Sequence, residues 1–144
     1  MKSLITVRWV AMGLLFFLGV SGVIGAFPMI VDPHGTPWQM PQSLLIHSPF
    51  HSYLVPGILL FCANGFLPLF ICAMVLNRSR NYAPLIAIQG VVLFGWIVIE
   101  CLMIRTVVWP HYLYGSVGLA MIVCGALLGC IVPRSAPSDV LVTR

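Results

Sequence analysis

Hydrophobic residues fall into four long stretches separated by short polar segments, at about Trp9–Val31, Tyr53–Leu76, Ala83–Val107 and Tyr112–Val132. Each stretch is long enough to cross ~30 Å of hydrocarbon at about 1.5 Å per helical residue. Backbone amides in lipid must find partners within their own segment, so each stretch is predicted to be a helix. We therefore expect an all-α integral membrane four-helix bundle over residues 1–132, followed by a flexible tail at 133–144.

The composition supports this fold class. Of the 144 residues, 60% are hydrophobic and only 7% are charged, and the mean hydropathy is +1.07. A soluble domain usually carries about 25% charged residues, so this chain cannot cover a water-facing surface. A soluble enzyme, a disordered chain and a conventional nucleic-acid binder are excluded, and the lipid bilayer is the partner that the composition implies.

The first stretch also fits a signal peptide, because Lys2 and Arg8 precede an apolar core. Its apolar part is long, however, and Ile24-Gly25-Ala26 has no small residue at the first position of a cleavage site. These two features favour a helix that is retained.

Basic residues mark one side of the predicted bundle. With four spans, the N-terminus, the middle loop and the tail share a side, and they hold Lys2, Arg8, Arg78, Arg80, Arg134 and Arg144. Only Arg105 falls near the other side. The positive-inside rule predicts cytoplasmic termini in an inner (plasma) membrane and an extracytoplasmic loop between the first two helices. The basic residues are scattered in pairs, so no nucleic-acid partner is expected.

The five cysteines all fall inside predicted helices. None of them forms a Cys-x-x-Cys pair, which a thiol–disulfide oxidoreductase would need. Cysteines inside helices usually behave as small apolar residues, so a structural role is favoured and no cofactor is expected.

The loop between the first two helices is long for a compact bundle and is predicted to form a structured cap. Asp32-Pro33 and Gly35 predict a turn, because aspartate bonds nearby amides and proline fixes φ. Ser48-Pro49 predicts a helix start, with the serine as N-cap and the proline in the first helical position.

All four histidines are predicted on the outer side: His34, His47, His51 and His111. On one helix His47 and His51 would share a face and could bind a transition metal, with Asp32 or Glu100 as a third ligand. Pro49 makes a continuous helix through both residues improbable. Interfacial, hydrogen-bonded histidines are the favoured interpretation, and no metal is assigned.

Glu100 is the only acidic residue within a predicted span. An ionisable group at membrane depth costs several kcal/mol unless it faces protein or water, so it is a candidate functional residue. Gln89 and Trp96 share its helix face, at spacings of eleven and four residues. Its expected neighbours are the first turn of the second span, near Tyr53 and Pro56, and the start of the fourth, near His111 and Tyr112.

Two interpretations of this face stay open. In one, an uncharged Glu100 and Gln89 hydrogen-bond across helices and fix their register. In the other, Glu100 binds a substrate or relays a proton in an outward-facing pocket, and it is the candidate catalytic residue. The candidate binding residues are Asp32, His34, His47, His51, Tyr53, Gln89, Trp96, Glu100, His111 and Tyr112.

Pro28 and Pro68 predict local distortions of their helices, since each removes one helical hydrogen bond. Asn64 lies four residues before Pro68 and is expected to satisfy the carbonyl groups that the proline leaves free, with a ligand contact as the less favoured alternative. Small residues four apart, such as Gly22 and Ala26, permit close helix contacts within the bundle or in a dimer.

With Asp32-Pro33-His34-Gly35 and the run Ser48-Pro49-Phe50-His51-Ser52-Tyr53-Leu54-Val55-Pro56-Gly57, the chain resembles a family of short bacterial membrane proteins with four predicted spans. The resemblance runs from the first helix through Trp109 and Tyr112. It implies an inner-membrane location and brings no activity, cofactor or catalytic residue.

Three functions are compatible with the sequence. The first is a non-enzymatic protein that binds a lipid or supports a membrane-protein partner, as a monomer or a homo-oligomer. The second is an intramembrane enzyme or ligand-binding protein that uses Glu100 with His51, His111 and Tyr53. The third is a proton-coupled small-molecule transporter. A pocket lined by Glu100 and histidines would favour the second.

Overall fold

The computed structural model describes residues 2–35, 40–79 and 81–131. Seven helical elements follow one another along these residues: α1 (Lys2–Val31), η1 (Gln42–Leu45), α2 (Leu54–Leu60), η2 (Phe61–Phe66), α3 (Leu67–Leu76), α4 (Tyr82–Ile104) and α5 (Trp109–Ile131). The short η1 is a 3-10 helix and η2 is a π-helix. No strand occurs among the residues that the structure describes.

Four segments are long and apolar enough to span a membrane: Leu4–Val31, Leu54–Leu76, Tyr82–Ile104 and Trp109–Cys130. The elements α2, η2 and α3 continue without a break and together form the second of them. The prediction of an all-helical bundle with four apolar spans is confirmed. The predicted tail at 133–144 lies outside the described residues.

The helix ends differ from the predicted ones for local reasons. Helix α1 begins at Lys2, well before Trp9, because the polar residues ahead of the apolar stretch continue the same helix. Helix α4 ends at Ile104, since Arg105 adopts a left-handed conformation with φ of 55°. Helix α5 begins at Trp109, which puts Pro110 in its first turn, where a missing N–H costs little.

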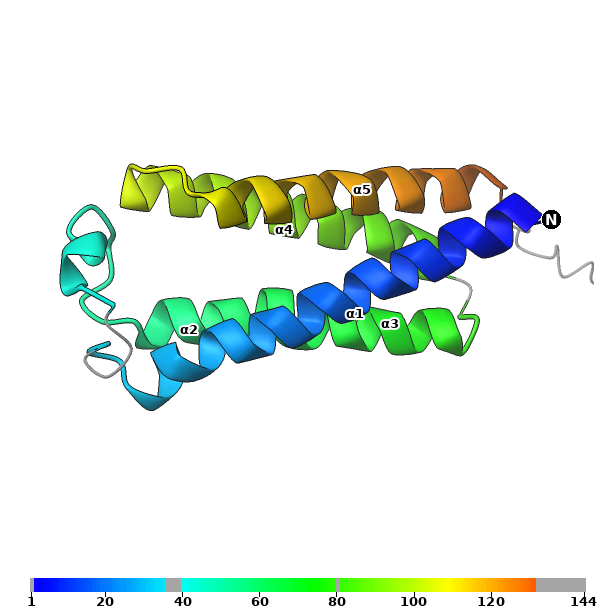
Figure 1. The fold of residues 1–144 in the computed structure, drawn as a ribbon. Coiled ribbons are helices and arrows are strands. Elements are labelled where there is room, and N and C mark those ends of the chain that lie inside the picture. Colours follow the sequence, from blue (N-terminus) through cyan, green and yellow to red (C-terminus); the bar gives the residue numbers. More distant parts are fainter. Residues whose placement is uncertain (1, 36–39, 80, 132–144) are drawn as a thin grey trace, which may run out of the picture.

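The spans form two pairs (Figure 1). Helices α4 and α5 pack against each other along their length, while α1 lies against α2, η2 and α3. The pairs meet through contacts of α1 with α5 and of α3 with α4. They diverge toward the end that carries η1 and the α4–α5 connection, which we call the cap end.

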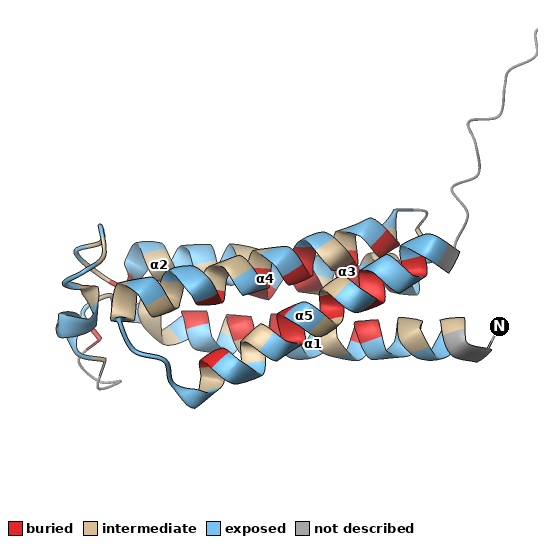
Figure 2. Cartoon of the chain, turned by 90° about the horizontal axis from the view of Figure 1, so that it is seen from above, coloured by how far each residue is buried: buried red, intermediate tan, exposed pale blue. Residues whose placement is uncertain are grey.

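The core lies between the two pairs. Its largest fully buried hydrophobic side chains are Leu15, Leu18, Ile71, Ile86, Leu93, Met121 and Leu128. Exposed residues cover the outward faces of the helices (Figure 2). Many of these are large and apolar, such as Phe16 and Leu102. A bundle whose outer faces are apolar matches hydrocarbon rather than water as its surroundings.

Glycines allow the closest helix contacts. A Cβ added at Gly22 of α1 would lie 2.2 Å from the Asn64 carbonyl oxygen of η2. A Cβ added at Gly90 of α4 would lie 2.6 Å from the Gly118 carbonyl oxygen of α5. Any larger residue would push these backbones apart, so both glycines serve contacts inside the bundle.

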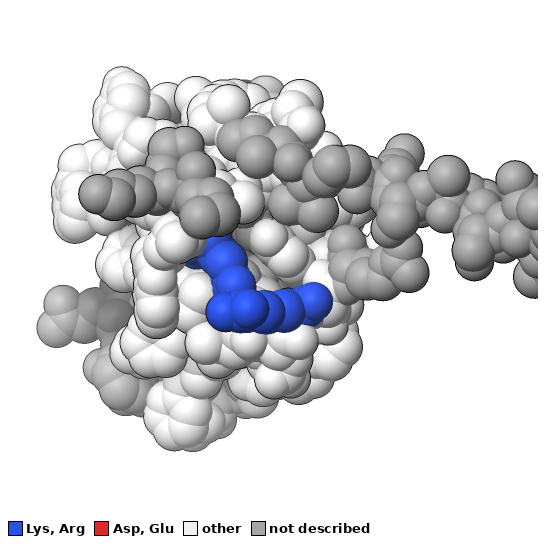
Figure 3. Space-filling model, turned by 90° about the vertical axis from the view of Figure 1, so that its right-hand side faces the viewer, with Lys and Arg blue, Asp and Glu red and all other residues white. Residues whose placement is uncertain are grey.

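Arg8 joins three helices at the end opposite the cap. Its guanidinium donates to the carbonyl of Val75 at the end of α3 and lies 5.9 Å from the centre of the Tyr82 ring in α4. Helix carboxyl ends attract cations, and an arginine over an aromatic ring adds a cation–π contact. The blue atoms at this end belong to arginine, and no acidic side chain is seen there among the residues described (Figure 3).

The cap consists of the described residues 32–35 and 40–53. The predicted turn is present: the Gly35 N–H donates to the Asp32 carbonyl at 3.0 Å, and Gly35 has a φ of +72°. Tyr53 anchors the rest, because its N–H donates to the Pro33 carbonyl and its hydroxyl to the Pro41 carbonyl, at 2.9 and 2.7 Å. The cap therefore folds around one buried tyrosine.

The predicted helix start at Ser48-Pro49 is wrong. The Ser48 hydroxyl donates to the Leu45 carbonyl at 2.9 Å and accepts the Phe50 N–H at 3.2 Å, which makes a local turn. Helix α2 begins only at Leu54, with Tyr53 as its N-cap residue. A serine forms such turns as readily as it caps a helix, and the tyrosine anchor decides between them here.

Candidate functional site

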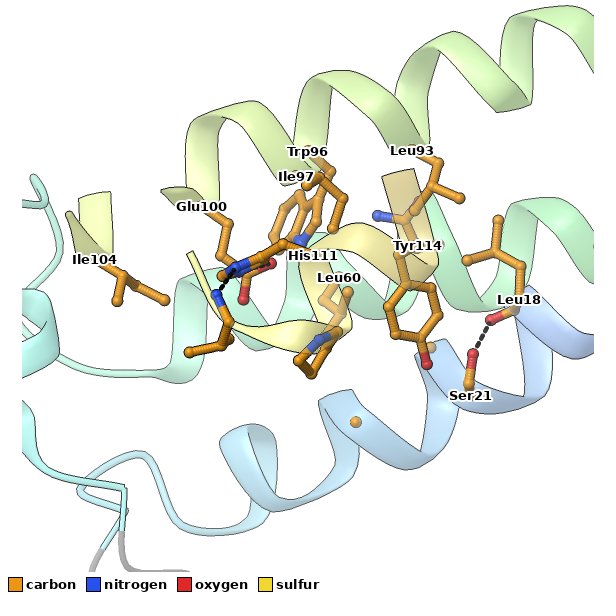
Figure 4. Close-up of a pocket in the computed structure, with 15 residues that line it drawn as sticks. Leu18, Ser21, Leu60, Leu93, Trp96, Ile97, Glu100, Ile104, His111 and Tyr114 are labelled. Carbon is orange, nitrogen blue, oxygen red and sulfur yellow. Dashed lines mark hydrogen bonds and ion pairs between the residues drawn. The ribbon is translucent and has the colours of Figure 1, made fainter. Parts of the chain in front are cut away.

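A half-enclosed pocket lies between the two helix pairs toward the cap end, with a volume of about 240 Å³ (Figure 4). Its wall is mostly apolar and comes from α1, α2, η2, α4, the α4–α5 connection and α5. The residues that carry polar side-chain groups in this wall are Ser21, Asn64, Trp96, Glu100, His111 and Tyr114. Glu100 is the only carboxylate among them, and no lysine or arginine lines the pocket.

Glu100 sits on the last turns of α4 and turns toward α5 (Figure 4). One carboxylate oxygen, Oε2, lies 3.8 Å from Nε2 of His111. That separation is longer than a hydrogen bond, so the contact is electrostatic and leaves acceptor capacity on the carboxylate. About a third of the side chain, 35%, remains exposed. The carboxylate therefore borders the pocket and is held near a second polar group.

His111 has a structural task as well. The ring nitrogen Nδ1 of His111 accepts the backbone N–H of Val108 at 3.0 Å. The backbone N–H of His111 in turn donates to the Val108 carbonyl. Helix α5 begins at Trp109, so Val108 is the N-cap residue and His111 the third helical residue, as in a capping box.

This cap fixes the tautomer of the ring. An Nδ1 that accepts a hydrogen bond carries no proton, so the proton of the neutral imidazole lies on Nε2 and points toward Glu100. The buried histidine therefore presents its Nε2 to the carboxylate.

The π-helix explains a second polar feature. The Leu67 N–H donates to the Cys62 carbonyl five residues back, and Pro68 has no N–H to offer. The Ala63 carbonyl thereby loses both helical donors. The Gln89 side-chain N–H of α4 donates to it instead, at 2.9 Å. This bond crosses between the helix pairs and satisfies the carbonyl that the π-helix and Pro68 leave free.

Asn64 does not take the predicted role. It is 1% exposed, and neither its side-chain nitrogen nor its side-chain oxygen has a hydrogen-bond partner in the structure. The expectation that it satisfies carbonyl groups near Pro68 is wrong, because Gln89 reaches the Ala63 carbonyl from a neighbouring helix. Asn64 lines the pocket instead. An unpartnered amide buried in apolar surroundings is costly, so this side chain is a marker for a ligand.

The predicted binding residues divide into two groups. Trp96, Glu100 and His111 line the pocket, and Gln89 lies behind it as a cross-helix donor. The structure does not bring the others to the pocket: Asp32, His34, His47, His51, Tyr53 and Tyr112. Tyr112 follows His111 but points outward, with an exposed fraction of 72%.

The cap holds most of this second group. The ring nitrogen Nδ1 of His34 accepts a hydrogen bond from the Gln42 side-chain amide at 3.2 Å. The backbone N–H of His34 donates to the Asp32 carboxylate. His47 and His51 are exposed. Burial raises the pKa of the Tyr53 phenol above its ordinary value, which keeps the hydroxyl a donor to Pro41. Among the described residues, no group of three or more His, Cys, Asp or Glu side chains could hold a metal ion.

Sequence reasoning missed two polar residues of the pocket. Ser21 and Tyr114 face the pocket from α1 and α5, and the Ser21 hydroxyl donates to the Leu18 carbonyl at 3.0 Å. Tyr114 stacks on Phe17 with 6.0 Å between ring centres. For Asn64, a ligand contact was the less favoured of the two interpretations. Tyr114 lies three residues after His111, which puts it on the same helix face, and that spacing was the available signal.

No protein-family model matches the sequence, and no curated protein or solved structure matches it.

Proposed function

We propose that this chain, whose four apolar helices fit a multi-pass membrane protein, is a binding protein without catalytic activity. The pocket between the helix pairs takes the polar head of a small amphipathic molecule. The observation that carries this proposal is Glu100, which keeps acceptor capacity 3.8 Å from His111 inside a mostly apolar wall. The unpartnered Asn64 amide in the same wall supports it.

Size favours an amphiphile over a compact solute. Ligand pockets usually measure about 300–1,000 Å³, and this one measures about 240 Å³ and is half-enclosed. It therefore has room for a head group and the first carbons of a chain. The rest of the chain would lie outside, along the apolar surface of the bundle.

The pocket can be tested with three eight-carbon probes of different charge: octanol, octylamine and octanoate. Replacing Trp9, Trp38 and Trp109 with phenylalanine leaves Trp96, which lines the pocket, as the only tryptophan of the chain. At least one probe is expected to change Trp96 emission with a saturable dependence on concentration.

A matched pair of variants separates the pocket from general partitioning into the membrane. Gly25→Phe adds a ring to the pocket wall, whereas Gly129→Phe adds the same ring on α5, where nothing lies within 4 Å of the new Cβ. We expect the first variant to lose the saturable response and the second to keep it. Equal responses from both variants, or none from any probe, would contradict the proposal.

The placement of the protein is part of the same proposal. The six-to-one distribution of basic residues supports cytoplasmic termini, with the cap end outside, and the family resemblance supports a bacterial inner membrane. A cysteine introduced at exposed His47, in a chain whose own cysteines are replaced by alanine, should react with a membrane-impermeant maleimide from outside intact cells. A cysteine at exposed Arg78 should react only after the membrane is opened.

A further inference from the structure

The charge inside the pocket has one sign. Glu100 is its only carboxylate, and no lysine or arginine lines it. Arg105, one residue beyond α4, is exposed and does not reach the wall. The other ionisable side chains in the wall are His111, whose Nδ1 accepts the Val108 N–H, and Tyr114, whose phenol supplies no positive charge. Glu100 therefore has no lysine or arginine as a countercharge in the wall.

Two acceptors in the pocket wall are open to a ligand. The carboxylate lies beyond hydrogen-bonding distance of His111 Nε2, and the Asn64 side-chain amide has no partner on its oxygen or on its nitrogen. The Ser21 hydroxyl already uses its proton on the Leu18 carbonyl. A head group that donates hydrogen bonds would fit these acceptors, whereas an anionic head would oppose Glu100.

The aromatic neighbour points to the same chemistry. Trp96 lies one turn before Glu100 on α4 and lines the pocket with it (Figure 4). The Trp96 side chain hydrogen-bonds to the Glu100 carboxylate, and its indole N–H is the donor. A carboxylate held in the wall in this way favours an ammonium group over a neutral hydroxyl of the same size.

We infer that the head group this pocket selects is a protonated amine, so that the ligand is an amphiphile with an ammonium head and an apolar chain. This inference rests on the proposed function and specifies the charge of the ligand's head group. The ammonium group donates to Glu100. The chain leaves the pocket through its open side toward lipid. Such an amine could belong to a free amphiphile or to the head group of an aminophospholipid.

The three octyl probes test this inference in the protein that keeps only Trp96. Because hydrogen bonds to charged groups are the stronger ones, octylamine is expected to bind about tenfold or more tighter than octanol. Octanoate is expected to bind more weakly than either. If octanol and octylamine bind equally well, the amine inference is wrong and the proposed function stands. If no probe binds saturably, both fail.

Glu100→Gln locates the preference. The glutamine keeps the size of the side chain and its ability to hydrogen-bond but removes the charge. We expect this variant to bind octanol as before and to lose most of its preference for octylamine. Tyr112→Phe, on the exposed side of α5, is the matched control and should keep the preference. A preference that survives Glu100→Gln would overturn the assignment of the ammonium to Glu100.

A last arm distinguishes the two sources of the amine. Octylamine binding is compared in nanodiscs of phosphatidylcholine alone and of phosphatidylcholine with phosphatidylethanolamine. Weaker apparent binding in the second membrane indicates that the lipid amine competes for the pocket, which supports an aminophospholipid as ligand. Equal binding in both supports a free amine.

Discussion

His111 uses its two ring nitrogens for two different purposes. Nδ1 accepts the Val108 N–H at the start of α5, and Nε2 faces the Glu100 carboxylate. The first contact caps the start of α5 and fixes the orientation of the imidazole ring. Because the backbone of Val108 holds the ring, Nε2 faces Glu100 without help from another side chain.

Two substitutions test the first contact. His111→Gln keeps an acceptor that can reach the Val108 N–H, as in a capping box, whereas His111→Leu removes it. We expect the leucine variant to lose about 1 kcal/mol of unfolding free energy, the usual value of such a bond, and the glutamine variant to lose less. Thermal unfolding in detergent measures both. Equal losses would mean that the cap contributes nothing.

Tyr53 gives the cap a dependence on alkaline pH. Its folded-state pKa is raised by burial, and its neutral hydroxyl donates to the Pro41 carbonyl. Because the pKa is raised relative to the unfolded chain, this stabilisation is fully present below the ordinary tyrosine pKa of about 10 and is lost as pH rises through the folded-state pKa.

The prediction concerns the difference between the protein and Tyr53→Phe. At neutral pH the variant is expected to be about 1 kcal/mol less stable, and this difference should shrink toward zero as the pH rises above about 10. Unfolding followed in detergent over this range measures it. A difference that stays constant with pH would show that the hydroxyl bond does not stabilise the cap.

At the scale of elements, the second span is the least regular. Its π-helix and Pro68 leave the Ala63 carbonyl without a helical donor, and Gln89 of α4 donates to it. The irregular backbone is thus compensated from a neighbouring helix, which is the usual way in which membrane helices tolerate proline. The same irregularity places Asn64 in the pocket wall.

A double-mutant cycle tests this compensation. Gln89→Leu alone should cost about 1–3 kcal/mol, because it leaves a buried carbonyl without a donor. In a Pro68→Ala background an N–H returns to this segment, so the carbonyl can be satisfied within the helix and Gln89→Leu should cost less. Additive losses in unfolding free energy would show that Gln89 and Pro68 act independently.

Gly22 makes the tightest of the glycine contacts between α1 and η2. Gly22→Ala would place its Cβ 2.2 Å from the Asn64 carbonyl oxygen, whereas Gly13→Ala in the same helix meets nothing within 4 Å. We expect the first variant to be destabilised by about 1–3 kcal/mol through overpacking and the second to be neutral or slightly stabilised. Comparable melting temperatures for the two variants would contradict the packing described here.

At the scale of the whole molecule, the sequence predicts the architecture well and the pocket in part. The four spans follow from the length and hydropathy of single stretches, which need no knowledge of neighbours. Glu100 is conspicuous because carboxylates are rare at membrane depth. The face it shares with Trp96 follows from helix periodicity alone.

What the sequence leaves open is how the helices are rotated against one another. Tyr53 and His51 belong to the same outer end as Glu100, yet they serve the cap, because the two helix pairs diverge there. Asn64 and Gln89 are both polar residues inside spans, and only their relative rotation decides which of them reaches the Ala63 carbonyl. Local pattern carries no information on that rotation.

The molecule as a whole then has two distinct ends. One is closed by Arg8, which joins α1 to the end of α3 and the start of α4. At the other the pairs separate, and the space between them holds the pocket beneath the cap. The central claim is that the Glu100 carboxylate in this space binds the head group of an amine amphiphile.

Glu100 is the only glutamate in the chain, so glutamate labelled with carbon-13 at the side-chain carboxyl reports on it without any substitution. The most direct test adds octylamine labelled with nitrogen-15 to this protein in bilayers and measures dipolar dephasing of the carboxyl carbon by solid-state nuclear magnetic resonance. We predict dephasing that saturates with octylamine and disappears when Gly25→Phe fills the pocket. A carboxyl signal that is not dephased at any octylamine concentration would contradict the claim.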